Sequence, residues 1–172
     1  MPKNLIIYYS RRGENYFGGE IRVIEKGNTE QVAQFIQAAV GGDLFEVETV
    51  KPYPPAYKAC IEQAKHELCD EARPALKKYI SDISEYDNIF ICGPCWWGRF
   101  PMAVFSLLEK LDFTGKKVMG LMTHEGSGLG NTERDLKKFC PGATFGQALA
   151  VHGSYVKNSQ EMVTAWAKEQ IG

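Results

Sequence analysis

Short apolar runs alternate along the chain with longer segments in which apolar residues recur every three or four positions. Residues 5–9 and 89–92 are continuously apolar, which is typical of strands buried on both faces of a parallel sheet. Residues 117–124 and 145–151 are also predicted to be strands, and residues 43–50 alternate in part, as an edge or near-edge strand does. The pattern therefore predicts five strands.

Helices are predicted in the segments between these strands. The first begins at Gly27-Asn28-Thr29, where Asn28 or Thr29 can cap it, and presents one apolar face until Gly41 and Gly42 end it. The second helix is predicted over residues 57–68, with a break near Pro74 and a resumption at residues 76–80. Three more helices are predicted over residues 101–111, 132–139 and 162–167.

Residues 13–26 interrupt this alternation. Asn15-Tyr16-Phe17 and residues 20–24 flank Gly18-Gly19, a pair that suits the tight turn of a β-hairpin. We interpret the segment as a small insertion between the first strand and the first helix.

Strands that alternate with helices indicate an α/β fold, in which a parallel sheet carries helices on both faces. In such sheets, ligands bind beyond the carboxyl ends of the strands. The unusual residues of this sequence lie at those ends, namely Ser10, residues 93–98 and residues 124–128. We therefore expect a ligand site at this edge of the sheet.

The composition is that of an ordinary globular protein, and residues 1–172 suit a single domain. The chain has 20 Lys and Arg against 21 Asp and Glu, so its net charge of −1 does not support a nucleic-acid groove, which needs clustered basic residues. No apolar run approaches the roughly 20 residues that span a bilayer, and the N-terminus shows no signal peptide. We expect a cytoplasmic protein without nucleic-acid or membrane partners.

Two interpretations compete for Cys92-Gly93-Pro94-Cys95. The spacing is that of a thioredoxin-type redox pair. Such a pair needs its first cysteine at a helix N-terminus, whereas Cys92 ends an apolar strand and the next helix begins only near Pro101. The sequence therefore favours Cys92 as a small buried hydrophobic residue. Five cysteines, an odd number, also argue against structural disulfides in a reducing compartment.

Trp96 and Trp97 follow directly, between Pro94 and Gly98. Adjacent tryptophans commonly serve packing. At the end of a strand they can also form an aromatic wall for a flat heterocycle, while backbone amides of the same loop meet the polar edge of the ring. Both interpretations stay open.

An anion site is suggested at the end of the first strand. Ser10, Arg11 and Arg12, together with Gly27-Asn28-Thr29 after the insertion, can surround an anion, because hydroxyl and amide groups donate and the helix dipole favours negative charge. The alternative is that Asn28 and Thr29 only cap the helix.

Several common motifs are missing from the sequence. Without a G-x-x-x-x-G-K-[ST] motif a nucleoside triphosphatase is not predicted, and no G-x-G-x-x-G follows the first strand to indicate a dinucleotide site. His124 and His152 both end strands, but no ligand spacing supports a metal site. No G-x-S-x-G elbow or Ser-His-Asp order indicates a hydrolase.

With Tyr9-Ser10-Arg11, Gly27-Asn28-Thr29, residues 94–98 and residues 123–128 in this order, the chain resembles the flavodoxin family, and most of all the branch with paired tryptophans in its second ligand loop. The resemblance implies a flavodoxin-like three-layer sandwich that binds FMN, with a five-stranded parallel sheet in the order 2-1-3-4-5. The resemblance assigns the FMN phosphate to Ser10, Arg11, Arg12, Gly27, Asn28 and Thr29. It assigns one side of the isoalloxazine ring to Pro94, Cys95, Trp96, Trp97 and Gly98. The other edge of the ring is assigned to His124, Glu125, Gly126, Ser127 and Gly128. The resemblance requires no catalytic side chain.

Three features depart from the family pattern. The insertion splits a phosphate loop that is usually continuous, Arg12 stands where threonine is common, and the net charge of −1 is far from the strongly acidic balance of electron-carrying flavodoxins. The resemblance implies an electron carrier for a redox partner protein, or alternatively an FMN-dependent NAD(P)H oxidoreductase acting on quinones or other small electron acceptors. A non-enzymatic domain that keeps the fold without the flavin is the alternative from another class.

Overall fold

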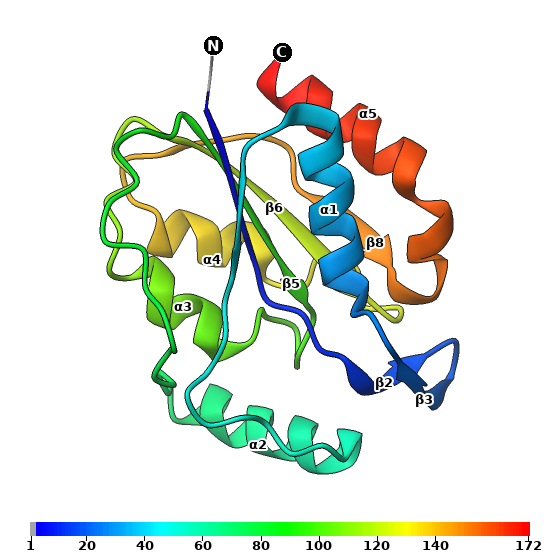
Figure 1. Ribbon diagram of the computed structural model, residues 1–172. Helices are drawn as coiled ribbons and strands as arrows, with labels where there is room; N and C mark the ends of the chain where they lie inside the picture. Colours follow the sequence, from blue (N-terminus) through cyan, green and yellow to red (C-terminus); the bar gives the residue numbers. More distant parts are fainter. Residues whose placement is uncertain (1–2) are drawn as a thin grey trace.

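The computed structural model describes residues 3–172 and shows an α/β fold of three layers (Figure 1). All strands of the main sheet are parallel, and their order is β4-β1-β5-β6-β7, with β8 also paired to β6. Among the main strands this is the predicted order 2-1-3-4-5, so the predicted fold is confirmed. The bounds are Asn4–Tyr8 for β1, Asp43–Glu46 for β4, Asn88–Pro94 for β5, Lys117–His124 for β6, Thr144–Phe145 for β7 and Leu149–His152 for β8.

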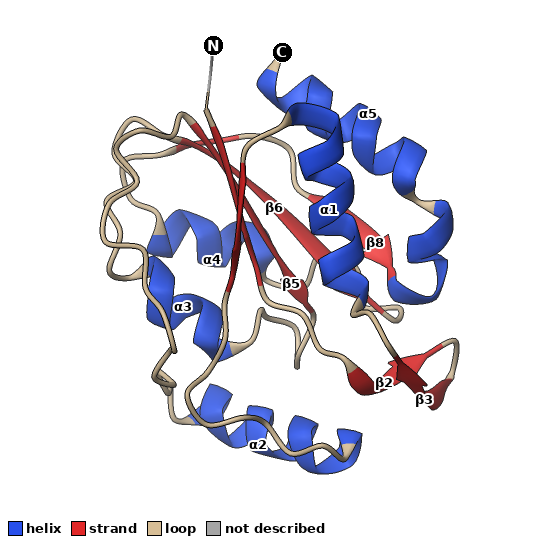
Figure 2. Ribbon diagram, viewed as in Figure 1, coloured by secondary structure: helices blue, strands red, loops and turns tan. Residues whose placement is uncertain are grey.

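Helices cover both faces of the sheet (Figure 2). Helices α1 (Asn28–Val40) and α5 (Gln160–Ile171) lie on one face, and α3 (Met102–Leu108) and α4 (Thr132–Phe139) lie on the other. Helix α2 (Tyr57–Cys69) contributes to the same core as α3, and a 3-10 helix, η1 (Gly153–Asn158), precedes α5. No helix within residues 3–172 is long and apolar enough to cross a membrane.

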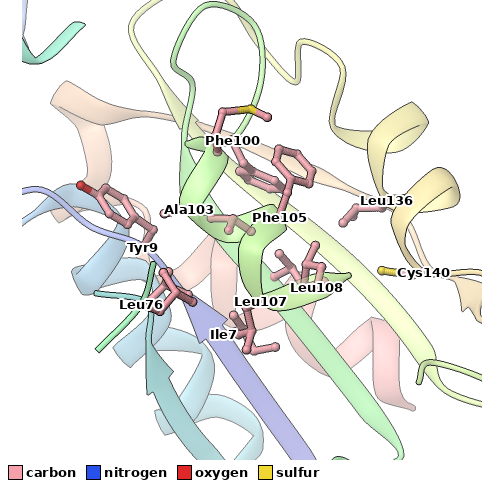
Figure 3. Close-up of a cluster of buried hydrophobic side chains, with 14 of the residues drawn as sticks. Ile7, Tyr9, Leu76, Phe100, Ala103, Phe105, Leu107, Leu108, Leu136 and Cys140 are labelled. Atoms are coloured by element: carbon pink, nitrogen blue, oxygen red, sulfur yellow. The ribbon is translucent and has the colours of Figure 1, made fainter. Parts of the chain in front are cut away.

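The continuous apolar runs are explained by this double cover. Leu5, Ile7 and Tyr9 point into the core beneath α3, whereas Ile6 and Tyr8 point into the core beneath α1 and α5. Because successive strand side chains face opposite ways, a strand covered on both sides needs no polar positions. Figure 3 shows part of the first core, with side chains of α3 packed beside Ile7.

The second predicted strand is shorter than expected, and the second predicted helix does not resume. Strand β4 ends at Glu46, and α2 covers the predicted residues but ends at Cys69, with no helix at residues 76–80. Instead, the chain after Pro74 pairs with the chain after β4, because the Val50 amide donates to the Ala75 carbonyl (2.9 Å) and the Lys77 amide donates to the Glu48 carbonyl (2.9 Å). These backbone groups are satisfied by pairing between loops rather than by a helix.

The predicted continuous strand over residues 145–151 is wrong in its middle, because β7 and β8 are separate. At Gly146 a Cβ would lie 2.7 Å from Met119 Cγ, so the backbone passes close to the sheet there. Gln147 then pairs with α5: its amide donates to Gln170 Oε1, and its carbonyl accepts from Trp166 Nε1, both at 2.8 Å. Pairing with α5 therefore replaces strand pairing at this point.

The predicted hairpin is present as a separate two-stranded antiparallel sheet of β2 (Gly13–Phe17) and β3 (Glu20–Ile24). Gly18 and Gly19 both have positive φ, 63° and 91°, as a two-residue hairpin turn requires. The hairpin lies near the carboxyl ends of β5, β6 and β8 (Figure 1). It therefore belongs to the edge of the sheet at which a ligand is expected.

Candidate functional site

A small cavity of about 80 Å³ lies at the carboxyl ends of β5 and β6. Six of the residues predicted for the site line it: Asn28, Pro94, Cys95, Trp96, His124 and Glu125. Five further lining residues were not predicted: Asn15, Tyr16, Tyr57, Thr123 and Gly153. A larger cavity of about 450 Å³ runs along the hairpin and shares Asn28 and Gly153 with the first.

The missed residues come mainly from segments other than the two expected loops. Tyr16 belongs to the hairpin and stacks on Tyr57 of α2, with ring centroids 6.3 Å apart. Glu14 fixes this arrangement, because its Oε1 accepts a hydrogen bond from the Tyr57 amide at the start of α2 (3.0 Å). The aromatic residues of the insertion could have indicated that it contributes to the site, but nothing in the sequence shows that they contact α2.

The two predicted phosphate-binding arginines are engaged with other groups of the protein. Arg11 donates to the carbonyls of Glu14, Pro54 and Pro55 at 2.8–3.0 Å. Arg12 makes a bidentate pair with Glu30 (3.0 and 2.8 Å), and this pair lowers the pKa of the Glu30 carboxyl. Both side chains, with Ser10, border a separate hollow beside β4. The structure therefore does not bring these arginines into the cavity.

The start of α1 differs from the predicted capping. Gly27 is the N-cap residue and has no side chain to cap the helix, and Asn28 and Thr29 already lie within the helix. The cap comes from the segment after β1 instead, since Ser10 Oγ accepts a hydrogen bond from the Glu30 amide (3.0 Å). Thr29 pairs with Thr123 of β6 through their hydroxyls (2.8 Å). Asn28 is thus left to face the cavity, and its buried Oδ1 has no hydrogen-bond partner within residues 3–172.

The loop after β5 is a tight turn. The Trp96 amide donates to the Arg99 carbonyl (2.8 Å), and the turn residues Trp97 and Gly98 have φ of 58° and 85°. For a tryptophan this left-handed conformation is strained by roughly 1–3 kcal/mol and needs support from its surroundings. Trp97 Nε1 donates to the Ile61 carbonyl of α2 (2.7 Å), and the Asn131 amide donates to the Gly98 carbonyl (2.8 Å).

The two tryptophans have different roles. Trp96 is only 8% exposed, packs edge-on against Tyr9 and Tyr53 with centroids 5.3 and 5.1 Å away, and also reaches the cavity. Trp97 is 48% exposed, lies outside the lining of this cavity and carries Lys65 over its ring. Trp96 therefore has the packing role and also reaches the cavity, where its role as a ligand wall stays a prediction, whereas Trp97 attaches the loop to α2.

Arg99 anchors the same loop to α4 and was not identified from the sequence as a residue of the site. It is 7% exposed, and its Nε donates to Asp135 Oδ2 on α4 (2.8 Å), a carboxylate that is itself buried. Its Nη1 reaches Glu71 Oε1 (3.1 Å), and its guanidinium lies over the Phe105 ring. A charge buried in this way needs its partner.

The cysteine arrangement follows the favoured interpretation. Cys92 is fully buried in β5, and burial raises the pKa of its thiol. All five cysteines are free. A thiol that resists ionisation is a poor nucleophile, so the structure supports a packing role for Cys92.

A cluster of titratable groups forms another side of the cavity. His124 and His152 are paired in register at the ends of β6 and β8, with ring centroids 5.3 Å apart. Glu125 follows His124 and lies 3.4 Å from His152, measured from Oε2 to Nδ1. Its Oε1 is buried without a hydrogen-bond partner in the described chain. Among residues 3–172, no group of three or more His, Cys, Asp and Glu is placed to hold a metal ion.

Comparison with known proteins gives one family. A family model described as flavodoxin matches residues 22–170. A comparison with curated protein sequences finds no match.

Solved structures share the fold. A protein from Bacteroides uniformis ATCC 8492, provisionally described as a flavoprotein, is 29% identical with a TM-score of 0.77, and the match covers 97% of this chain and 98% of that one. A second such protein, from Bacteroides eggerthii DSM 20697, is 27% identical with a TM-score of 0.70, over 94% and 97% of the two chains. A flavoprotein from Lactobacillus acidophilus NCFM, crystallised in complex with FMN, is 19% identical with a TM-score of 0.65, over 92% and 98%.

Proposed function

We propose that this chain, which belongs to the flavodoxin family, binds FMN non-covalently and transfers electrons through it. The flavin would supply the redox chemistry, and the protein would bind it, orient it and exclude water. The flavoprotein from Lactobacillus acidophilus, which was crystallised with FMN, has the same fold.

The observation that carries the proposal is a pair of unpaired polar oxygens from two residues that line one small cavity. Asn28 Oδ1 and Glu125 Oε1 are both buried without a partner within residues 3–172, and both residues flank Gly153. An unsatisfied buried polar atom costs about 1–3 kcal/mol, so a ligand that forms hydrogen bonds with these oxygens is expected here. FMN carries donors in its imide N–H and its ribityl hydroxyls and acceptors in its ring nitrogens, and Trp96 offers an aromatic surface to its ring.

The cavity is too small to hold FMN unless a part of the protein moves. About 80 Å³ is well below the roughly 300–1,000 Å³ typical of ligand pockets. The neighbouring cavity of about 450 Å³ shares two lining residues with it, Asn28 and Gly153. We infer that FMN enters when the hairpin, which contributes Asn15 and Tyr16, moves away from β5 and β6.

The phosphate is expected at the start of α1. Ser10, Gly27 and Thr29 meet there, and the positive end of the helix dipole favours an anion. Arg11 and Arg12 would take part only by leaving their present partners. Gly98, Gly126, Ser127 and Gly128 complete the proposed set through the two loops that approach the ring.

The direct test is the absorbance spectrum of the purified protein, followed by titration of the flavin-free protein with FMN. We expect a yellow protein, or tight reconstitution with FMN. Trp96→Ala should weaken FMN binding at least tenfold, whereas Trp97→Ala should change it less. If neither the purified nor the reconstituted protein binds FMN, the alternative of a flavodoxin fold without flavin is correct.

A second candidate is an NAD(P)H oxidoreductase that reduces quinones or other small acceptors. The hairpin favours it, because a wall over the cavity hinders a large partner protein more than a small molecule. The net charge of −1 also offers little attraction to a basic redox protein. Steady oxidation of NAD(P)H in the presence of a quinone would support this candidate, and electron transfer confined to protein partners would support the carrier.

A further inference from the structure

The His124–Glu125–His152 cluster contains more than flavin binding requires. His152 is the last residue of β8, and its Nδ1 faces two oxygens, Ser154 Oγ at 2.8 Å and Glu125 Oε2 at 3.4 Å. Both contacts use the same nitrogen, so the other ring nitrogen is left for solvent. With its side chain 34% exposed, His152 connects the buried carboxyl group with water.

Glu125 is the buried member of the cluster. Its side chain is 16% exposed, and burial raises the pKa of its carboxyl group, against the opposing effects of His152 and of the Gly18 and Ser154 amides. Glu125 lines the cavity, and its Oε1 has no hydrogen-bond partner within residues 3–172. A carboxyl group held in this way can carry a proton at the ligand site.

The other groups around Glu125 are less suited to exchange a proton. His124 Nδ1 accepts a hydrogen bond from the Gly126 amide (2.9 Å), which fixes the neutral ring, and burial and His152 both lower its pKa. Tyr57 of α2 also faces Glu125, but burial raises the pKa of its hydroxyl. Tyr155 of η1 contacts the far side of the His152 ring, at 5.2 Å between centroids.

We propose that Glu125 and His152 form a proton-exchange pair for the redox ligand of the cavity, with Glu125 Oε1 giving the proton to the ligand and His152 restoring it from solvent. This inference rests on the proposed FMN binding. It assigns His152, which belongs to neither predicted loop, a part in the chemistry.

A dihydronicotinamide is the hydride donor of the proposed step. A hydride brings FMN two electrons and one proton, so full reduction needs one further proton. Glu125 would supply it by breaking its Oε1–H bond as an N–H bond forms on the flavin. The carboxylate would then take a proton from His152, which takes one from water.

The test follows the rate of proton uptake. The FMN-loaded protein is photoreduced by a short light flash in weakly buffered solution near pH 7, and an indicator dye records how fast protons are taken up. Because Glu125 and His152 are returned to their starting state, the final number of protons stays the same, and we expect Glu125→Gln and His152→Gln to take them up roughly tenfold or more slowly than wild type.

A matched control is available on α2. Glu62 and His66 form an exposed pair 3.7 Å apart, with side chains 65% and 74% exposed. Glu62→Gln and His66→Gln should leave the rate of proton uptake unchanged. Glu125→Asp should retain part of the rate, which a purely structural role would not explain.

The outcomes separate the two proposals. Failure of wild type to bind FMN overturns the proposed function, and this inference with it. If FMN binds and Glu125→Gln takes up protons as fast as wild type, only the proton-exchange pair is refuted. An unchanged rate in His152→Gln alone also refutes the pair, and an equal slowing in the α2 control variants would show a general charge effect and refute it as well.

Discussion

The cavity has two walls that are built in different ways. One wall is formed by the loops after β5 and β6 (residues 95–101 and 125–131), which are attached to the buried sheet, to each other and to α2 and α4. The other is the β2–β3 hairpin, whose residues are mostly half-buried or exposed and whose strands form a separate sheet. A two-stranded sheet is marginally stable by itself. We call the first wall the fixed wall, because it can hold a ligand in one position. We call the hairpin the moving wall, because it can move to admit the ligand.

Helix α2 connects the two walls. The Ile61 carbonyl receives the Trp97 indole N–H from the fixed wall, and the Tyr57 amide and ring hold Glu14 and Tyr16 of the hairpin. These two attachments are one helical turn apart. A ligand that displaces the hairpin therefore acts on the same helix that supports Trp97.

The largest effect is expected from breaking the anchor of the fixed wall. Asp135→Ala leaves Arg99 charged, buried and without its main partner, which costs about 3–5 kcal/mol. Urea unfolding measures the change. A double variant, Arg99→Met with Asp135→Leu, should lose clearly less, and an Asp135→Ala protein as stable as wild type would show that the loop does not depend on this pair.

A smaller effect is expected where the two loops of the fixed wall touch. Gly130 has a φ of 51°, and a Cβ there would collide with the Gly98 backbone, so Gly130→Ala should cost about 1–3 kcal/mol and weaken FMN binding. For stability, Gly128 is the matched control, because its φ is also positive (67°) but a Cβ there meets nothing within 4 Å. Equal losses of stability in the two variants, measured by thermal unfolding, would contradict loop contact as the cause, and FMN titration of Gly130→Ala measures the change in binding.

Removing the moving wall should affect stability less. Joining Arg12 directly to Gly27 deletes the hairpin and should cost only about 1 kcal/mol, because little of the core is lost. Bound FMN should then become several times more accessible to iodide, as measured by fluorescence quenching. If the deletion unfolds the protein, the hairpin is part of the core and the comparison of the walls fails.

The smallest effects concern pH, and they have opposite signs in the two walls. Arg12 at the base of the hairpin lowers the pKa of Glu30, so this pair stabilises the fold above the ordinary carboxyl pKa, near 4.3, and the stabilisation is lost as the pH falls through the lowered value. Glu30→Gln should therefore lose less stability than wild type on acidification, by about 1 kcal/mol or less.

Glu125 in the fixed wall should behave in the opposite way. Because its pKa is raised, the native state binds its proton more tightly than the unfolded chain does, and stability declines as the pH rises from about 4.3 through the raised value. Glu125→Gln should remove this decline and be at least as stable as wild type at neutral pH. Unfolding curves across the pH range test this, and a Glu125→Gln protein that is less stable at neutral pH would disprove it.

The sequence was sufficient to predict the sheet because β1 and β5 carry apolar runs on both faces, as doubly covered parallel strands do, and because helical segments alternate with the strands. The hairpin was predictable from Gly18-Gly19. The division between β7 and β8 was not, because it depends on contacts of Gly146 and Gln147 with α5.

The fixed wall was predictable because its residues are consecutive in the sequence and follow strands. The contribution of Tyr16 and Tyr57 was not, since it requires the hairpin to fold over the sheet and meet α2. Arg99 and Asp135 were missed for a similar reason, because 36 residues separate two partners that form one buried pair. The adjacent positions of Trp96 and Trp97 in the sequence do not indicate that one side chain packs in the core and the other contacts α2.

The meeting of Ser10 and Gly27 has a consequence for how such a protein evolves. Gly27 lies so close to Ser10 that no Cβ fits there, so the chain leaves β1 and returns to α1 at nearly one point. Closing a longer loop between such ends adds little free energy, since the cost grows only slowly with length. A segment can therefore be gained, exchanged or lost here in one genetic event, and the wall of a binding site can change while the sheet stays the same.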